Sequence, residues 1–155
     1  MPLTKGSPAP DFTLPNSENQ PVSLRSFRGQ PTVVLFFPLA FTGVCTEEMC
    51  TMRDNMGQYN GMNTQVLGVS VDSPFTLAQF KQKENLNFPL LSDFNKEASE
   101  SYGVLYEDFF GLKGVSKRSA FVVDGDGNIA YAEVLEDAGK QPDYHAIQST
   151  LRELS

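Results

Sequence analysis

Two cysteines, Cys45 and Cys50, are the residues of this chain best suited to covalent chemistry. Cys45 follows an apolar run at residues 32–37, then Pro38, and it lies three residues after Thr42. A free thiol with a pKa near ~8.5 is only a few per cent thiolate at neutral pH, and the thiolate is the nucleophile. The first turn of a helix favours an anion through its unpaired N–H groups and the positive end of its dipole. A cysteine in that position is therefore a candidate nucleophile.

Thr42 is the predicted N-cap of the helix that carries Cys45. Cys45 then occupies the third helical position, whose N–H can donate to the Thr42 hydroxyl. We expect the hydroxyl and the sulfur to share a small polar pocket that Pro38 and Phe41 wall off from water. The alternatives are a buried structural cysteine, a threonine that only caps the helix and a proline that only ends the strand.

Strand and helix patterns alternate along the chain, which predicts an α/β fold with a mixed sheet flanked by helices. The apolar run 32–37 has the composition of a strand buried on both faces, and the segments near its carboxyl end are expected to hold the chemistry. Segments 11–14 and 22–24 predict an N-terminal β-hairpin. The other predicted strands are 65–71, 88–91, 120–123 and 129–135; the predicted helices are 42–59, 76–84 capped by Ser73, 95–101 and 143–154; and 105–117 is a predicted loop.

Composition predicts one domain spanning residues 1–155, because 40% hydrophobic residues suffice for a real core at this length. A net charge of −7 argues against nucleic acid and anionic membranes as partners. The chain has no membrane-spanning apolar stretch, and its first residues lack the apolar core of a signal peptide. Two cysteines are too few for a secreted disulfide framework, so we expect a cytoplasmic location.

The spacing Pro38-x-x-x-Thr42-x-x-Cys45 resembles the active-site motif of the peroxiredoxins, thiol peroxidases with a thioredoxin-like fold. The string FPLAFTGVC resembles the alkyl hydroperoxide reductase E group of that family. CTEEMCTMRD, which contains Cys50, is instead similar to the bacterioferritin-comigratory, or Q-type, group. The resemblance covers nearly the whole chain, through the segments GSPAPDF at 6–12, VSVD at 69–72, LSD at 91–93 and RSAFVVD at 118–124.

This resemblance implies a peroxidase that reduces hydrogen peroxide and organic hydroperoxides through a sulfenic acid at Cys45. It places Arg118 beside the nucleophile, where a cation would stabilise the thiolate and donate to the peroxide oxygens. Glu48 is then the acceptor that orients Arg118, and Thr42 a further donor to the developing charge. Without the resemblance, Arg118 reads as a solvated surface charge like Lys117, and Glu48 as a first-turn acid that complements the helix dipole.

Cys50 lies five residues after Cys45, and on an intact helix this separation prevents a disulfide. The rise is about 7.5 Å with about 140° of extra rotation, whereas a disulfide needs Cα atoms within ~7 Å. Any Cys45–Cys50 bond therefore requires the helix to unwind. The resemblance to the Q-type group implies that Cys50 is the resolving thiol. The alternative is a one-cysteine peroxidase in which Cys50 only packs.

The implied partners are a hydroperoxide substrate, a thioredoxin- or glutaredoxin-like reductant and a second copy of the chain in a homodimer near the active-site loops. No metal, flavin or nicotinamide cofactor is implied. Residues 124–128 (DGDGN) lack the later ligands of a calcium loop and predict a hairpin turn, and His145 is expected to be a surface or packing residue. Phe41, Phe109 and Phe110 are expected to form an apolar mouth that favours alkyl hydroperoxides.

Three rival functions stay open at this point. A thioredoxin-type oxidoreductase usually carries Cys-x-x-Cys, whereas four residues separate the cysteines here. A redox-switched chaperone would use helix unwinding to expose its methionines, Met49, Met52 and Met56. A copper-delivery protein would want a histidine near the cysteines, and the only histidine is His145.

Overall fold

A five-stranded mixed sheet forms the centre of the computed structural model, which describes residues 3–154. The strand order is β5-β4-β3-β6-β7; β3, β4 and β5 run parallel, and β6 and β7 are antiparallel additions. The strands are β3 (Thr32–Phe36), β4 (Gln65–Ser70), β5 (Leu90–Ser92), β6 (Ser119–Val123) and β7 (Ile129–Val134). The predicted mixed sheet is confirmed.

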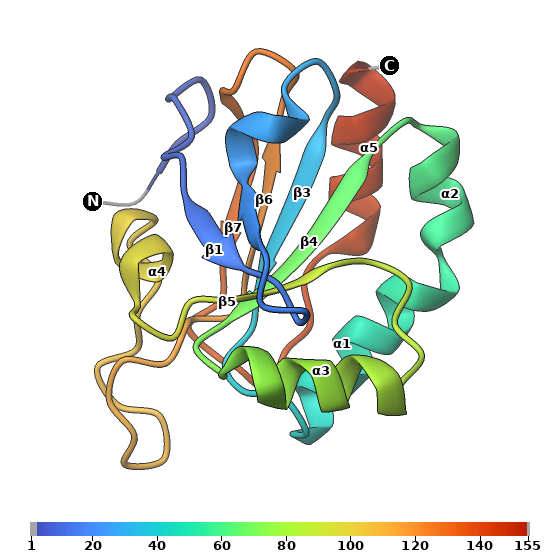
Figure 1. Cartoon of the computed structure of the whole chain (residues 1–155). Helices are drawn as coiled ribbons and strands as arrows, with labels where there is room; N and C mark the ends of the chain where they lie inside the picture. Colours follow the sequence, from blue (N-terminus) through green and yellow to red (C-terminus); the bar gives the residue numbers. More distant parts are fainter. Residues whose placement is uncertain (1–2, 155) are drawn as a thin grey trace.

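Side chains of β3 alternate between two hydrophobic cores, one on each face of the sheet. Val33 and Leu35 belong to a core shared with helices α1, α2, α3 and α5, whereas Val34 and Phe36 belong to a core shared with the N-terminal strands and α4. In Figure 1 the sheet lies between α4 and β1 on the left and α1, α2 and α5 on the right. The helices are α1 (Gly43–Asp54), α2 (Met56–Gly61), α3 (Pro74–Lys83), α4 (Glu97–Ser101) and α5 (Tyr144–Leu154), with a short 3-10 helix, η1 (Leu24–Phe27).

The predicted N-terminal hairpin is present as β1 (Thr13–Pro15) paired antiparallel with β2 (Pro21–Ser23). Ser73 caps α3 as predicted, because its hydroxyl accepts a hydrogen bond from the Thr76 N–H at 3.1 Å. The closing helix and the strands at 119–123 and 129–134 also lie where the sequence predicts them, within a residue or two.

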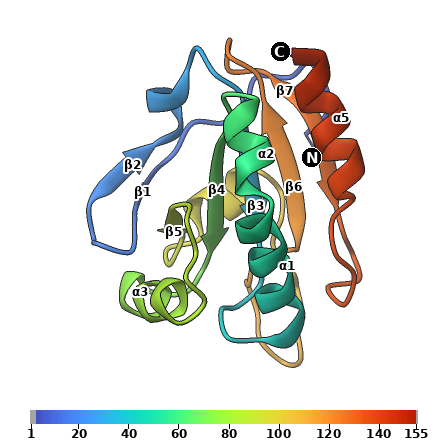
Figure 2. The same cartoon turned by 90° about the vertical axis from the view of Figure 1, so that its right-hand side faces the viewer.

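The prediction of one helix from Thr42 to Tyr59 is wrong in one respect, because the helix breaks at Asn55. Asn55 adopts φ −110° and ψ 9°, and its side-chain amide donates to the Thr51 carbonyl at 2.7 Å. That bond satisfies a carbonyl of the last turn, and α2 then begins at Met56. Figure 2 shows α1 and α2 in front of the sheet, with α5 beside them.

Strand register brings distant parts of the chain to the start of α1. Phe36, at the carboxyl end of β3, pairs with Ser119, so Arg118 lies next to the point where β3 ends. Phe36 also pairs with Val69 of β4, which brings Asp72, two residues past the end of β4, to the same edge. The carboxyl ends of parallel strands are where open α/β sheets bind ligands.

Candidate active site

Cys45 lies at the third position of α1 and is buried, with only 1% of its surface exposed. Both cysteines are free thiols in this structure. The Arg118 guanidinium reaches Cys45 from the start of β6, and its Nη2 donates a hydrogen bond to Sγ at 3.2 Å. The arrangement places a buried cation against a thiol at a helix N-terminus, both of which stabilise a thiolate.

Glu48 holds the other side of the same guanidinium. Arg118 Nη1 donates to Glu48 Oε1 at 2.7 Å, and Arg118 Nε donates to the Ala138 carbonyl at 3.0 Å. Glu48 is fully buried, and its Oε2 has no hydrogen-bond partner among residues 3–154. Burial raises the pKa of Glu48 to about 7 although Arg118 opposes the rise. Burial by itself lowers the pKa of Arg118, but Glu48 and Cys45 outweigh it, so the net direction is upward.

Thr42 is the N-cap residue of α1, but the predicted capping bond is wrong. Its side chain makes no cap hydrogen bond, and its hydroxyl instead donates to the Leu39 carbonyl at 2.8 Å. A threonine hydroxyl can bond to either of these local backbone groups, and here the tight turn before α1 presents the carbonyl. The Thr42 oxygen keeps its lone pairs, so it can accept a hydrogen bond but has no second proton to donate.

Phe41 does not wall the site as predicted, because it does not line the open pocket beside Arg118. Pro38 is buried just after β3, and its role in shielding the thiol from water stays a prediction. Phe41 has a left-handed backbone, φ 67°, which turns its ring toward α3. There it packs against Phe80, with 5.2 Å between ring centroids, and the Lys83 ammonium lies 5.8 Å from its centre. The apolar mouth therefore excludes Phe41.

The pocket beside the thiol has a volume of about 980 Å³ and is built from several segments that are far apart in the sequence. Thr42, Gly43 and Val44 line it from the start of α1, and Arg118 lies at its inner end next to Cys45. The rest of the wall comes from Leu39, Lys117, residues 105–110 with Leu112, and residues 136–139. Phe109 and Phe110 thus line the pocket as predicted.

Cys50 points away from Cys45, toward the end of α3. Its thiol donates to Glu84 Oε1 at 3.5 Å, and the side chain is partly buried. Burial raises the pKa of Cys50, and the hydrogen bond to Glu84 raises it further. The two thiols stand on one continuous helix, so the structure shows the arrangement in which a disulfide cannot form.

The other residues considered from the sequence lie away from the thiol or at the rim. Lys117 is not a free surface charge: it lines the pocket and forms a 2.8 Å ion pair with Glu136. The Asp124 carboxylate accepts from the N–H groups of Asp126 and Asn128, as a hairpin turn requires. His145 is exposed, so of the two predicted alternatives it is a surface residue. Within residues 3–154 there is no cluster of metal-ligating side chains and no helix able to cross a membrane.

Two contributions to the site escaped the sequence analysis. The Asp72 carboxylate accepts from the Ala40 N–H at 2.8 Å and from the Ser70 hydroxyl at 2.6 Å, which fixes the turn that leads into α1. The Ala138 carbonyl accepts a hydrogen bond from Arg118 Nε and so holds the third nitrogen of the guanidinium in place. The position of Asp72 just after a buried strand was a usable signal for the first, whereas a backbone carbonyl in a loop leaves no signal in the sequence.

Comparisons with known proteins identify the family of the chain. The AhpC/TSA family matches residues 5–132. Peroxiredoxin Bcp of Escherichia coli K12 is 38% identical over 154 residues, covering 98% of this chain and 97% of the relative. Alkyl hydroperoxide reductase E of Mycobacterium bovis is 41% identical over 143 residues, covering 90% and 88%.

Solved structures give the same answer for the fold. Peroxidoxin BcpB from Mycobacterium tuberculosis has a TM-score of 0.87 at 28% identity, covering 99% of both chains. A peroxiredoxin-like protein from Aquifex aeolicus has a TM-score of 0.91 at 28% identity, covering 100% of this chain and 90% of the other. The mixed resemblance read from the sequence is therefore confirmed, and with it the thioredoxin-like fold. The chain belongs to the AhpC/TSA family and is a peroxiredoxin, a thiol-dependent peroxidase.

Proposed function

We propose that this peroxidase reduces hydrogen peroxide and organic hydroperoxides at Cys45 and that Cys50 resolves the oxidised thiol. The observation that carries the proposal is the buried Arg118 guanidinium, which bridges the Cys45 sulfur and the Glu48 carboxylate at the inner end of an open pocket. A cation fixed in this way can stabilise the thiolate, and also the negative charge on the oxygen that leaves when the O–O bond of the peroxide breaks.

In the first step the Cys45 thiolate attacks the terminal oxygen of the peroxide. The O–O bond breaks, the sulfur becomes a sulfenic acid, and the remaining oxygen takes a proton and leaves as water or an alcohol. Arg118 and the free N–H groups of the first turn of α1 would stabilise the negative charge that develops on that oxygen. Because the Thr42 proton is held by Leu39, the Thr42 oxygen would accept the peroxide O–H and orient the substrate.

In the second step the Cys50 thiolate attacks the Cys45 sulfenic acid, and a disulfide forms as water leaves. The intact α1 keeps the two sulfurs on different faces, so its first turns must unwind before this step. A dithiol protein of the thioredoxin or glutaredoxin type would then reduce the disulfide.

A cytoplasmic location and a single domain over 1–155 stay predictions from the sequence.

A homodimer is also part of the proposal. Phe41 and Phe94 are 47% and 61% exposed, and large apolar side chains left open to solvent are typical of a surface that contacts another protein. Sedimentation equilibrium would test it: we expect about twice the 17.1 kDa of one chain, with Phe94→Ser weakening the association. A mass of one chain at micromolar concentration would exclude the dimer.

Intact mass after one equivalent of hydrogen peroxide tests the chemistry on fully reduced protein. A product about 2 Da lighter shows a disulfide, and Cys50→Ser should convert it to one about 16 Da heavier that reacts with dimedone. If the wild-type product is itself about 16 Da heavier, the enzyme works with one cysteine and Cys50 is structural. No mass change within seconds would rule out Cys45 as the peroxidatic thiol.

Two of the rival functions make different demands. A thioredoxin-type oxidoreductase would reduce insulin disulfides, which we do not expect here. A redox-switched chaperone would still bind unfolded clients when Cys45 is replaced by serine, whereas a peroxidase would lose its activity entirely.

A further inference from the structure

The short helix α4 is held in place by a side chain outside it. A helix of this length is not stable in water by itself. Its N-cap residue, Lys96, has a left-handed backbone, φ 65°, and makes no side-chain cap hydrogen bond. The buried Asp93 supplies the cap instead: one carboxylate oxygen accepts from the Ala98 N–H at 3.0 Å, and the other accepts from the Ser99 N–H at 2.6 Å. A carboxylate just after β5 therefore sets the position of α4.

Ser99 connects α4 to the segment that leads to Arg118. Its hydroxyl lies 2.7 Å from the hydroxyl of Ser116, and both side chains are fully buried. Two backbone bonds run alongside this contact. The Val104 N–H donates to the Ser99 carbonyl at 2.8 Å, and the Lys117 N–H donates to the Val104 carbonyl at 2.6 Å. The residues directly before Arg118 are thus held against α4.

The same line of contacts continues from Asp93 to the turn before α1. The Asp93 N–H donates to the Ser70 carbonyl at 2.6 Å, and the Ser70 hydroxyl donates to the Asp72 carboxylate at 2.6 Å. That carboxylate also accepts from the Ala40 N–H at 2.8 Å, in the turn that leads to Cys45. One polar seam therefore joins the segment that carries the thiol to the segment that carries the guanidinium. This polar seam consists of Ser70, Asp72, Asp93, Ser99 and Ser116.

Stability alone does not require the hydroxyls of Ser99 and Ser116. Two apolar groups of the same shape can replace a buried hydrogen-bonded pair at nearly no cost, whereas a fully satisfied pair specifies one arrangement. The arrangement at stake is that of Arg118, whose Nη2 lies 3.2 Å from Cys45 Sγ. We infer that Ser99 and Ser116 are positioning residues of the peroxidase, which hold the Arg118 guanidinium where the Cys45 sulfur needs it. This inference rests on the reaction proposed at Cys45.

Ser116→Ala tests the inference in reduced, full-length protein. We expect the second-order rate constant of Cys45 oxidation by hydrogen peroxide to fall roughly tenfold, since a shift of about 1 Å in a catalytic group can cost about 100-fold. Ser99→Ala removes the other half of the same hydrogen bond and should lose a similar factor. The double variant should lose no more than either single variant, because the two changes remove one interaction.

The measurement that separates positioning from packing is the dependence on Arg118. In an Arg118→Lys background the guanidinium is already absent, so Ser116→Ala should change the rate constant by less than about twofold. Its effect on the melting temperature should be the same in both backgrounds, because the same buried hydrogen bond is lost in each. A packing role predicts an equal loss of rate in both backgrounds.

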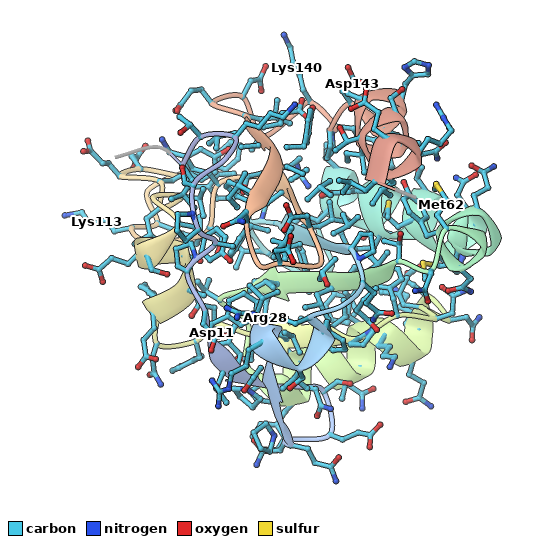
Figure 3. All side chains as sticks on the ribbon, turned by 90° about the horizontal axis from the view of Figure 1, so that it is seen from above. Asp11, Arg28, Met62, Lys113, Lys140 and Asp143 are labelled. Carbon is cyan, nitrogen blue, oxygen red and sulfur yellow. The ribbon has the colours of Figure 1, made fainter. Side chains whose placement is uncertain are left out.

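Two control variants remove side chains from the same two segments. Ser101→Ala takes a hydroxyl from α4 that donates to the Ala98 carbonyl at 3.0 Å and lies outside the polar seam. Lys113→Ala shortens an exposed side chain of the loop at 105–117, which points outward at the edge of the molecule in Figure 3. Both variants should react with hydrogen peroxide like the wild type.

Each contrary result has a separate meaning. Wild-type rate constants in Ser116→Ala and Ser99→Ala overturn the inference and leave the peroxidase in place. An equal loss with and without the Arg118 guanidinium also overturns it, because the seam then acts on the fold and not through Arg118. If Ser116→Ala does not fold, Ser99→Ala provides the same comparison. Wild-type protein that does not react with hydrogen peroxide removes the proposed function itself.

Discussion

All three nitrogen atoms of the Arg118 guanidinium donate hydrogen bonds, to Cys45, Glu48 and Ala138. The side chain is 2% exposed, so its position is fixed by these partners and not by solvent. A lysine ammonium could supply the charge but not three donors in one plane. At this site, therefore, geometry and charge can be separated by substitution.

Arg118→Lys should lower the second-order rate constant for Cys45 oxidation by hydrogen peroxide roughly 100-fold, the usual cost of losing one charge-stabilising donor. Quenched-flow sampling with intact mass would measure the rate. Arg28→Lys, a conservative change at an exposed arginine, should react like the wild type. Equal rates for Arg118→Lys and wild type would mean that charge alone is sufficient.

Glu48 should make the stability of the protein depend on pH. Its pKa is about 7 in the fold, against 4.5 in its ordinary state. Between these values the folded protein keeps a proton that the unfolded chain has lost, so the free energy of unfolding falls as pH rises. This contribution is fully present below about 4.5, is lost above about 7, and is on the order of 3 kcal/mol.

Glu48→Gln should therefore lose less stability than the wild type between pH 5 and pH 8, as measured by urea unfolding at both values. Glu47→Gln is the control: Glu47 is the exposed neighbour, and this variant should keep the wild-type pH dependence. Parallel pH profiles for wild type and Glu48→Gln would show that the buried carboxyl does not hold the proton.

How much of the site the sequence could predict differs from residue to residue. Cys45, Arg118 and Glu48 lie together as the motif and the resemblance indicated. The Thr42 hydroxyl does not, because its choice between two backbone partners depends on the exact turn at Leu39. Phe41 points to α3 because its left-handed backbone, which no side-chain pattern reveals, reverses its direction.

At the scale of the element, α1 is tied to the end of α3 around Cys50. Besides the bond from Cys50 to the Glu84 carboxylate, Arg53 Nη1 donates to the Glu84 carbonyl at 2.6 Å. Asn87 donates its side-chain amide to the Arg53 carbonyl at 3.3 Å. Any unwinding that carries Cys50 to Cys45 must break the first of these contacts. Glu84 therefore restrains the thiol that we propose as resolving.

Glu84→Ala should speed disulfide formation from the sulfenic acid by about fivefold, because one hydrogen bond that holds Cys50 in place is gone. Alkylation quenching followed by intact mass would give the rate. Glu153→Ala, a matched change at an exposed acid in the last turn of α5, should leave it unchanged. If Glu84→Ala forms the disulfide no faster, the Cys50–Glu84 hydrogen bond does not limit the rate, and other contacts of α1 set the rate of unwinding.

The break between α1 and α2 shows what a hydrophobic pattern cannot reveal. Met49, Met52, Met56 and Tyr59 are all buried in one core and keep helical spacing through the break. At Asn55 the backbone leaves the helical conformation, and the Asn55 side chain donates to the Thr51 carbonyl. Spacing predicts which face is buried, whereas the end of a helix depends on local backbone and side-chain hydrogen bonds.

At the scale of the molecule, the pocket joins segments that no local pattern connects. The continuous apolar run at 32–37 was enough to predict a buried central strand, but the order β5-β4-β3-β6-β7 comes from pairing between distant segments. That order brings residues 42–44, residues 105–110 with Leu112, and residues 136–139 around one hollow. The pocket is thus a property of the topology. The sequence could predict single lining residues such as Phe109 and Phe110, but not how the segments come together.

Disulfide formation should lower the stability of the whole protein. Met49 and Met52 are fully buried in the helical core, and each buried side chain of this kind contributes about 1.5–3 kcal/mol. Unwinding α1 would remove that contribution, whereas closing a loop of six residues restores only roughly 2 kcal/mol. The loss exceeds the gain, so the oxidised protein should melt at a lower temperature than the reduced one.

Hydrogen exchange would locate the loss. After one equivalent of peroxide, we expect faster exchange across α1 and α2 and little change in β3, β4 and β6, whose ladders do not depend on α1. Cys50→Ser, which stops at the sulfenic acid, should keep both its melting temperature and slow exchange in α1. If the oxidised wild type melts no lower and exchanges no faster than this variant, the expected unwinding of α1 on disulfide formation is wrong.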